Sequence, residues 1–179
     1  MRITRKNILN LRRLLSNPKQ LFILLIISLA LFLMQEFSQE GEHFSAQVLR
    51  VIDGDTIEIS YQNEKSKIRF FGIDAPELKQ EFGEESKLFL SSLIDKKQVE
   101  VFKKDKDKYN RILAIIKLNN EDINKKMVRF GYAHAYIYYS DIYKDDEKIA
   151  KENKLGLWAD KNPVSPYEWR KKNNLIKKN

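Results

Sequence analysis

The chain has 179 residues, with 33 Lys and Arg, 25 Asp and Glu, and no Cys. This length suits one domain of roughly 100 to 150 residues plus terminal segments, and the lack of cysteine excludes disulfide scaffolds, thiolate metal sites and cysteine nucleophiles. The net charge of +8 comes from the two ends, because residues 41–160 hold 21 basic and 22 acidic side chains, so net charge alone does not predict a nucleic-acid groove.

The first 40 residues combine a basic start with an apolar run. Six Lys and Arg precede residues 21–34, a run of 14 residues that only Ser28 interrupts. A helix over this run would span about 21 Å, less than the roughly 30 Å of a hydrocarbon core. A buried core helix is the alternative, but the run has no polar face. The pattern therefore favours an export segment, and the poor cleavage signal at Phe44-Ser45-Ala46 favours an uncleaved signal anchor over a signal peptide.

The charges around this run predict its orientation. Basic residues before it indicate a cytoplasmic N-terminus, so the chain after residue 40 would lie outside the cell. We expect a single-pass membrane protein with an extracellular domain, and secretion after signal cleavage is the alternative. The expected parts are a basic and hydrophobic segment, a linker, one domain and a basic tail, at 1–35, 36–44, 45–160 and 161–179 respectively.

The first half of the expected domain has strand patterns and then a helix pattern. Three short segments alternate or are continuously apolar, namely 46–52, 56–61 and 67–73. Asp53-Gly54 and Gln62-Asn63-Glu64 separate them as hairpin turns would, so they form an antiparallel meander. Apolar residues at helical spacing, with acidic residues in the first turn, predict a helix over 83–93.

The second half continues with two strands and then helices. Strands are predicted over 99–102 and 112–118, on either side of the charged loop KKDKDKYNR. Helices are predicted over 123–130, 142–153 and 166–172; glycines end the first two, and Ser165 caps the last. Five short strands with inserted helices indicate an α+β protein that is mainly β. We expect a five-stranded OB-fold barrel with about three packed α-helices, preceded by one hydrophobic N-terminal helix.

Acidic residues gather at the open end of the second predicted hairpin. Asp55 lies about eight residues before the turn near residue 63 and Asp74 about eleven after it, so the hairpin returns both carboxylates to one end. Two carboxylates and a backbone carbonyl suit a hard cation such as Ca²⁺ or Mg²⁺. Zinc is not expected, because His43 and His134 are far apart in the sequence and there is no Cys.

Three further residues complete a hydrolytic pattern. Glu77 beside such a cation could orient or deprotonate a water. Arg69 and Arg111 could each bind a phosphate through paired N–H groups and stabilise charge in an in-line displacement. Each motif alone has an ordinary structural explanation, since Asp-Gly is a common hairpin turn. Their joint occurrence in this order indicates a metal-assisted phosphodiester hydrolase.

Five motifs in this order resemble the staphylococcal nuclease (thermonuclease) family. They lie between about Ala46 and Trp158 and read VIDGDT, IRFFGIDAPE, DKYNR, MVRFGYAHAYIY and GLWAD. The resemblance implies an OB-fold barrel and Ca²⁺-dependent endonuclease cleavage of DNA and RNA that gives 3′-phosphate ends. Position 75 is Ala where the best-known member has Thr, which leaves a carbonyl ligand intact. Asn110 replaces a Gly, and Asn tolerates the left-handed backbone that a Gly would adopt.

The resemblance also assigns roles to individual residues. Calcium would be held by the carboxylates of Asp55 and Asp74 and the backbone carbonyl of Ala75. Arg69 and Arg111 would bind the phosphate and stabilise the transition state, and Glu77 would position or activate the attacking water. Lys108 and Tyr109 would flank the phosphate, and Tyr136 or Tyr138 would stack on a base.

A second hypothesis is a catalytically silent OB module, anchored to the membrane, that binds nucleic acid or a protein. The intact set of three acids and two arginines favours the enzyme, because a binding module does not need all five. We expect nucleic acid as the substrate, a membrane contact through the N-terminal segment, no protein partner and a monomer.

Overall fold

The computed structural model describes residues 17–38 and 42–173, with side chains for 17–32 and 42–173. The structure does not describe residues 1–16, which contain most of the basic residues before the apolar run. It also leaves out residues 39–41 of the expected linker and residues 174–179 of the expected tail. The chain divides into two units, Met1–Gly41 and Glu42–Asn179, each of which is considered by itself.

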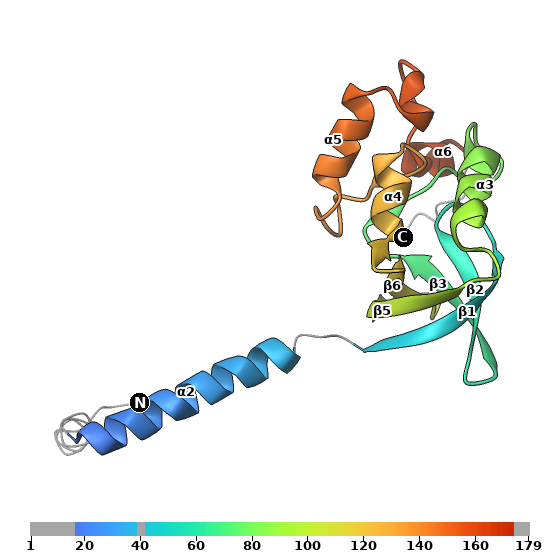
Figure 1. The fold of residues 1–179 in the computed structure, drawn as a ribbon. Helices are drawn as coiled ribbons and strands as arrows, with labels where there is room; N and C mark the ends of the chain where they lie inside the picture. The colour runs from blue at the N-terminus through green and yellow to red at the C-terminus, as the bar shows by residue number, and fades with distance from the viewer. Residues whose placement is uncertain (1–16, 39–41, 174–179) are drawn as a thin grey trace. The chain divides into compact units, whose positions relative to one another are not determined.

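The first unit contains the helix α2 (Pro18–Ser38), drawn in blue in Figure 1. Proline suits the first helical position, and the Asn17 side chain accepts a hydrogen bond from the backbone N–H of Lys19 at 3.1 Å. All apolar side chains described between Leu21 and Phe32 are exposed. The predicted hydrophobic helix is therefore present and extends beyond the apolar run at both ends. Within the described parts of the chain, no helix has both the length and the hydropathy needed to cross a bilayer.

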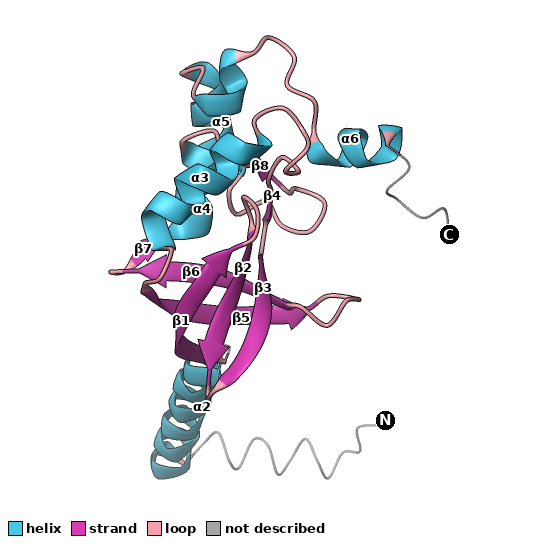
Figure 2. Cartoon of the chain, turned by 90° about the vertical axis from the view of Figure 1, so that its right-hand side faces the viewer, coloured by secondary structure: helices cyan, strands magenta, loops and turns pink. Residues whose placement is uncertain are grey.

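The second unit is built around a closed barrel of five strands. They are β1 (His43–Val51), β2 (Thr56–Tyr61), β3 (Glu64–Phe70), β5 (Gln98–Lys106) and β6 (Ile112–Leu118). Their order is β3-β2-β1-β5-β6, and a parallel pairing of β3 with β6 closes the sheet on itself. Register shifts in β1 and β5 mark bulges of the kind that bend strands around a barrel. The predicted five-stranded OB-fold barrel is thus confirmed (Figure 2).

Alternation along the strands fills the barrel. In β1, Phe44, Ala46 and Val48 are buried and the residues between them are exposed. The β2–β3 hairpin turns at Gln62 and Asn63, both with positive φ, as a two-residue type I′ turn requires. This turn sets the register that pairs the base of β2 with the end of β3.

Helices and short strands cover one end of the barrel (Figure 2). The helices are α3 (Gly83–Ile94), α4 (Ile123–Arg129), α5 (Lys144–Glu152), the 3₁₀ helix η1 (Gly156–Ala159) and α6 (Pro166–Lys172). Short strands β4 (Ile73–Asp74) and β8 (His134–Ala135) pair with each other, and β7 (Glu121–Asp122) extends β6.

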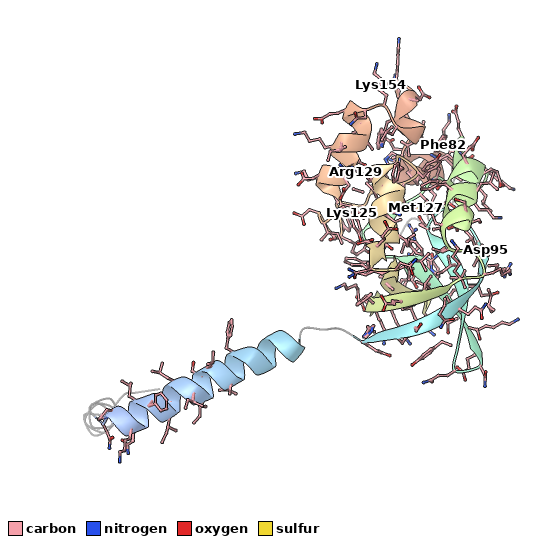
Figure 3. All side chains as sticks on the ribbon, in the orientation of Figure 1. Phe82, Asp95, Lys125, Met127, Arg129 and Lys154 are labelled. Carbon is pink, nitrogen blue, oxygen red and sulfur yellow. The ribbon has the colours of Figure 1, made fainter. Side chains whose placement is uncertain are left out.

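Two sides of α4 hold this layer together (Figure 3). Met127 is fully buried in the core, whereas Arg129 and Lys125 form ion pairs with Asp146 of α5 at 3.1 and 3.9 Å. The buried amide of Asn124 links the two strands whose pairing closes the barrel, β3 and β6. It donates to the carbonyls of Phe71, just after β3, and of Ala114 in β6, and its oxygen accepts from the N–H of Ile116.

Two predicted strands differ from the observed ones. The predicted strand over 67–73 is two elements, because the backbone turns at Gly72 with φ +77° and the residues after it pair with β8 instead. The strand predicted over 99–102 continues as β5 through Lys106. The charged end of β5, residues 103–106, is paired with β6, so charged side chains do not prevent a strand there.

Candidate active site

Two buried carboxylates meet at the end of the β2–β3 hairpin, where the hairpin argument places them. Asp55 precedes β2 and Asp74 ends β4, and their exposed fractions are 5% and 3%. The guanidinium of Arg69 bridges them: Nη1 is ion-paired with Asp55, and Nη2 donates to Asp74 at 2.7 Å. Both carboxylates therefore lie within the width of a single guanidinium.

The backbone around these acids is closely packed. The Asp55 carboxylate accepts a 2.6 Å hydrogen bond from the N–H of Ala75, which joins the two sides of the site. A Cβ on Gly54 would lie 2.7 Å from the Cβ of Ala75 and 2.0 Å from Oγ of Ser86. The glycine of VIDGDT is therefore needed for close approach of the helix α3, in addition to its place in a turn.

Asp53 contacts the site through the backbone of Asp55. Its carboxylate accepts a 3.0 Å hydrogen bond from the N–H of Asp55. Burial raises the pKa of Asp53, while the positive charge of Arg69 acts in the opposite direction. Burial likewise lowers the pKa of Arg69, against the favourable charges of Asp74 and Asp53.

Glu77 lies in the loop between β4 and α3, and its side chain is 36% exposed. Its side chain is far more exposed than those of Asp55 and Asp74, as expected of a group that acts on a water. A Cβ on Gly83 would fall 2.0 Å from the Glu77 carbonyl, so a glycine there allows this loop to fold against the start of α3.

A residue absent from the sequence-based site completes it. Arg170 of α6 donates from Nη1 to Glu77 at 2.8 Å and from Nη2 to Asp74 at 2.9 Å. Burial opposes its charge, but the hydrogen bonds and charges of Asp74 and Glu77 outweigh this and raise the pKa of Arg170. The acidic set of Asp55, Asp74 and Glu77 is thus in contact with two guanidinium groups.

Arg111 reaches the site from the β5–β6 loop. The parallel pairing of β3 with β6, which aligns Ile68 with Ile112, brings this loop beside Arg69. The charge of Arg111 lowers the pKa of Arg69, so the two guanidinium groups act on each other electrostatically. Asn110 has φ +60°, the left-handed conformation expected where the residue replaces a glycine.

The loop itself is organised by Asp107, which sequence reasoning did not single out. Its carboxylate accepts from the N–H groups of Tyr109 and Arg111 and, at 2.7 Å, from Nε of Arg111. Holding Arg111 by Nε leaves the outer nitrogens of the guanidinium for a phosphate. Lys108 and Tyr109 are exposed, and the charges of Lys108 and Arg111 lie 5.3 and 5.6 Å from the Tyr109 ring centroid.

The tyrosine segment borders the site at one point. Tyr136 directly follows β8, which pairs with β4, and its N–H donates to the carbonyl of Gly72 at 2.9 Å. Burial and the charge of Asp74 raise the pKa of Tyr136. Tyr138 and Tyr139 stand further out, with exposed fractions of 82% and 67%, and their rings are 5.3 Å apart. Of the two predicted stacking residues, Tyr136 directly follows the strand that pairs with Asp74, and Tyr138 has the exposed ring.

The donor set fits a hard cation. In the described part of the chain, no group of three or more His, Cys, Asp and Glu side chains is arranged as a metal site. The predicted ligands are only two carboxylates and a backbone carbonyl, all oxygen, from Asp55, Asp74 and Ala75. The carboxylates of Asp55 and Asp74 are buried and lie against the same guanidinium group, and carboxylate and carbonyl oxygens are the ligands that a hard cation prefers.

Comparison with known proteins agrees with this geometry. The staphylococcal nuclease homologue family model matches residues 67–160. An uncharacterized endonuclease of Haemophilus influenzae is 38% identical over 155 residues, covering 85% of this chain and 87% of the relative. Protein ParB of Escherichia coli is 31% identical over 166 residues, covering 86% and 94%. A micrococcal nuclease of Shigella flexneri is 34% identical over 142 residues, covering 72% and 81%.

The chain therefore belongs to the staphylococcal nuclease family. It is a nuclease, a hydrolase whose substrate is nucleic acid.

Proposed function

We propose that this nuclease is a Ca²⁺-dependent endonuclease that cleaves DNA and RNA outside the cell and leaves 3′-phosphate ends. The observation that supports this best is the convergence of Asp55, Asp74 and Glu77 on two shared guanidinium groups at one end of the barrel. Side chains from the loop before β2, from β3, from β4 with the loop after it, and from α6 meet there, which a silent binding module would not require.

The residues divide the hydrolysis between them. Asp55, Asp74 and the Ala75 carbonyl would hold the cation, which when bound would supply positive charge to offset the charge on the phosphate oxygens. Glu77 would orient a water and accept its proton as the water oxygen bonds to phosphorus. The bond from phosphorus to the 5′ oxygen would break, and that oxygen would leave with the electron pair and take a proton from solvent water. Arg69 and Arg111 would stabilise the added charge on the phosphoryl oxygens.

Calcium suits both the ligands and the proposed compartment. An all-oxygen set with few protein ligands gives weak binding, and extracellular calcium sites typically bind at about 10⁻⁴ to 10⁻³ M. Such a site fills outside the cell and stays empty in the cytosol. The dependence on calcium therefore agrees with an enzyme that acts after export.

The experiment is a cleavage assay on the full-length chain, purified in a mild detergent. Single-stranded and duplex DNA and RNA are incubated with Ca²⁺, Mg²⁺ or EDTA. We expect cleavage with Ca²⁺ that EDTA abolishes, and product ends that a polymerase extends only after phosphatase treatment. Cleavage in EDTA, or ends that are extended without phosphatase, would contradict the proposal.

The proposed location rests on the N-terminal segment. Six basic residues precede the apolar run 21–34, whose described side chains, up to Phe32, are all exposed, as in an export segment that is either retained as an anchor or removed. Because the chain has no Cys, single substitutions give a clean labelling test. A membrane-impermeant maleimide should label Lys161→Cys in intact cells and Asn10→Cys only after permeabilisation. The reverse pattern, or Lys161→Cys protein that is neither labelled on intact cells nor released into the medium, would refute an external domain.

A further inference from the structure

The helix α6 lies outside the part of the chain that matches the family model, which ends at residue 160. It nevertheless has strong folding signals of its own. Ser165 and Glu168 form a reciprocal capping box, and Pro166 occupies the first turn and is buried. This seven-residue helix is therefore a defined element.

The segment before α6 is tied to the loop that carries Glu77. The Gln80 side chain donates to the carbonyl of Val164 at 2.7 Å, and its oxygen accepts from the N–H of Glu77 at 3.2 Å. One side chain thus links the catalytic loop with the approach to α6. The helix is held where its Arg170 can reach the acids.

Arg170 makes contacts of two kinds in the site. With Glu77 it forms a single 2.8 Å bond, and with Asp74 it forms a forked pair at 3.2 and 2.9 Å. Its side chain is only 23% exposed, so these bonds are partly shielded from water. Bonds between ions in such surroundings are stronger and more directional than those on an open surface.

We propose that Arg170 is a positioning residue of the nuclease site, which holds the Glu77 carboxylate in place and competes with the cation for Asp74. This inference rests on the proposed function, because it assumes that Asp74 is a cation ligand and Glu77 the group that acts on water. The oxygens of Asp74 that bind Arg170 are those that a cation would need. The bond from Nη1 of Arg170 to Glu77 is separate from the Nη2 bond to Asp74, so Arg170 could still hold Glu77 if Asp74 bound a cation.

Two effects of opposite sign follow from the double contact. Removing the guanidinium frees Asp74 and takes one positive charge from the site, so the cation should bind more tightly. The same change releases Glu77, so the chemical step should slow. A helix that served only stability would not produce tighter cation binding together with slower turnover.

The experiment compares the full-length chain with its Arg170→Gln variant. Calorimetric titration with Ca²⁺ alone measures cation affinity, and cleavage at saturating Ca²⁺ gives kcat and KM. We expect Ca²⁺ to bind about tenfold more tightly, the factor that corresponds to one lost charge-assisted hydrogen bond. We expect kcat to fall roughly tenfold or more, since misplacing a catalytic group is costly, with little change in KM.

Three further variants separate positioning from folding. Lys172→Gln removes the same charge from the same helix, and within the described residues Lys172 is exposed and makes no hydrogen bond or ion pair; it should match the wild type in both measurements. Arg170→Lys keeps the positive charge but cannot make the paired hydrogen bonds of a guanidinium, so its Ca²⁺ affinity and its kcat should lie between those of the wild type and Arg170→Gln. Ser165→Ala removes the cap and should shift both values in the same directions as Arg170→Gln, but less.

The possible outcomes are distinct. Wild-type chain that does not cleave under any metal condition would refute the proposed function itself. Active wild type with an Arg170→Gln variant unchanged in Ca²⁺ affinity and kcat would overturn the inference alone. A raised KM with unchanged kcat would also overturn it, because Arg170 would then bind substrate phosphate instead of positioning Glu77.

Discussion

Asp107 holds the loop that presents Arg111, and its replacement gives a direct test of that arrangement. The variant Asp107→Asn keeps the side-chain shape and an oxygen that can accept from the N–H groups of Tyr109 and Arg111. It loses the 2.7 Å bond to Nε of Arg111, because an amide N–H₂ cannot accept there. Arg111 would then no longer be fixed with its outer nitrogens toward the substrate.

The expected size follows from that one bond. A hydrogen bond between charged groups contributes about 1.5 to 3 kcal/mol, and the Arg111 and Asp107 side chains are 29% and 15% exposed, so screening by solvent is limited. If this energy orients Arg111 for the transition state, kcat/KM should fall by roughly ten- to a hundredfold. The cation affinity should stay the same, since Asp107 has no contact with the acids among the described residues.

The assay measures kcat/KM for the wild type, Asp107→Asn and the matched control Asp105→Asn. Asp105 lies two residues earlier, in β5, and carries the same charge, but its described hydrogen bond is only to the N–H of Lys106. The control should keep wild-type activity. Equal losses in the two variants would refute the positioning of Arg111 and would indicate that the negative charge near the β5–β6 loop is what matters.

The same bond predicts a dependence of stability on pH. Burial opposes ionisation of Asp107, but hydrogen bonds from Arg111 and Tyr109 outweigh it and lower the pKa of this carboxyl. A lowered pKa in the folded state stabilises the protein above the unfolded-state value, and this contribution is lost as the pH falls below about 4. The stability difference between wild type and Asp107→Asn should therefore be present near neutral pH and shrink in acid.

Three other substitutions test separate parts of the site. Glu77→Gln should lower kcat by about a hundredfold or more while nucleic acid still binds, measured by single-turnover cleavage and by filter binding; retained cleavage would exclude Glu77 as the group acting on water. Tyr138→Ala should weaken binding of single-stranded substrate by roughly 1 to 3 kcal/mol without changing Tm, because this ring is exposed; unchanged affinity would remove it from the substrate path. Gly54→Ala should cost about 1 to 3 kcal/mol of stability, measured by denaturant unfolding, because its Cβ would overlap Ser86 and Ala75; an unchanged unfolding midpoint would contradict the close packing.

The barrel was predictable because local signals agree with one another. Alternation in β1 and the two-residue turn at Gln62-Asn63 determine which faces are buried and how the hairpin is paired. Pairing Thr56 with Arg69 then returns Asp55 and Asp74 to one end, as the hairpin argument required. Those short-range patterns are enough to predict the part of the site that lies at the ends of the two adjacent strands β2 and β3.

Other features depend on contacts between distant segments. Arg170 is 96 residues from Asp74, and nothing in the local pattern of α6 indicates which side chain it would meet. The capping signals of Ser165 and Glu168 predicted that a helix forms there, but not where it packs. The bond between Asp107 and Arg111 joins residues only four apart, but it depends on the conformation of the loop, which the sequence pattern did not define.

Calcium titration of the cleavage rate, for the wild type and Asp55→Asn side by side, tests the central claim most directly. If Asp55 is a cation ligand, wild-type cleavage should be abolished by EDTA and restored by Ca²⁺ with half-saturation at about 10⁻⁴ to 10⁻³ M. Asp55→Asn should need far more Ca²⁺ or show no cleavage, and circular dichroism should confirm that it is folded. Cleavage by the wild type in EDTA, or the same half-saturation in a folded Asp55→Asn chain, would contradict a calcium site at this end of the barrel.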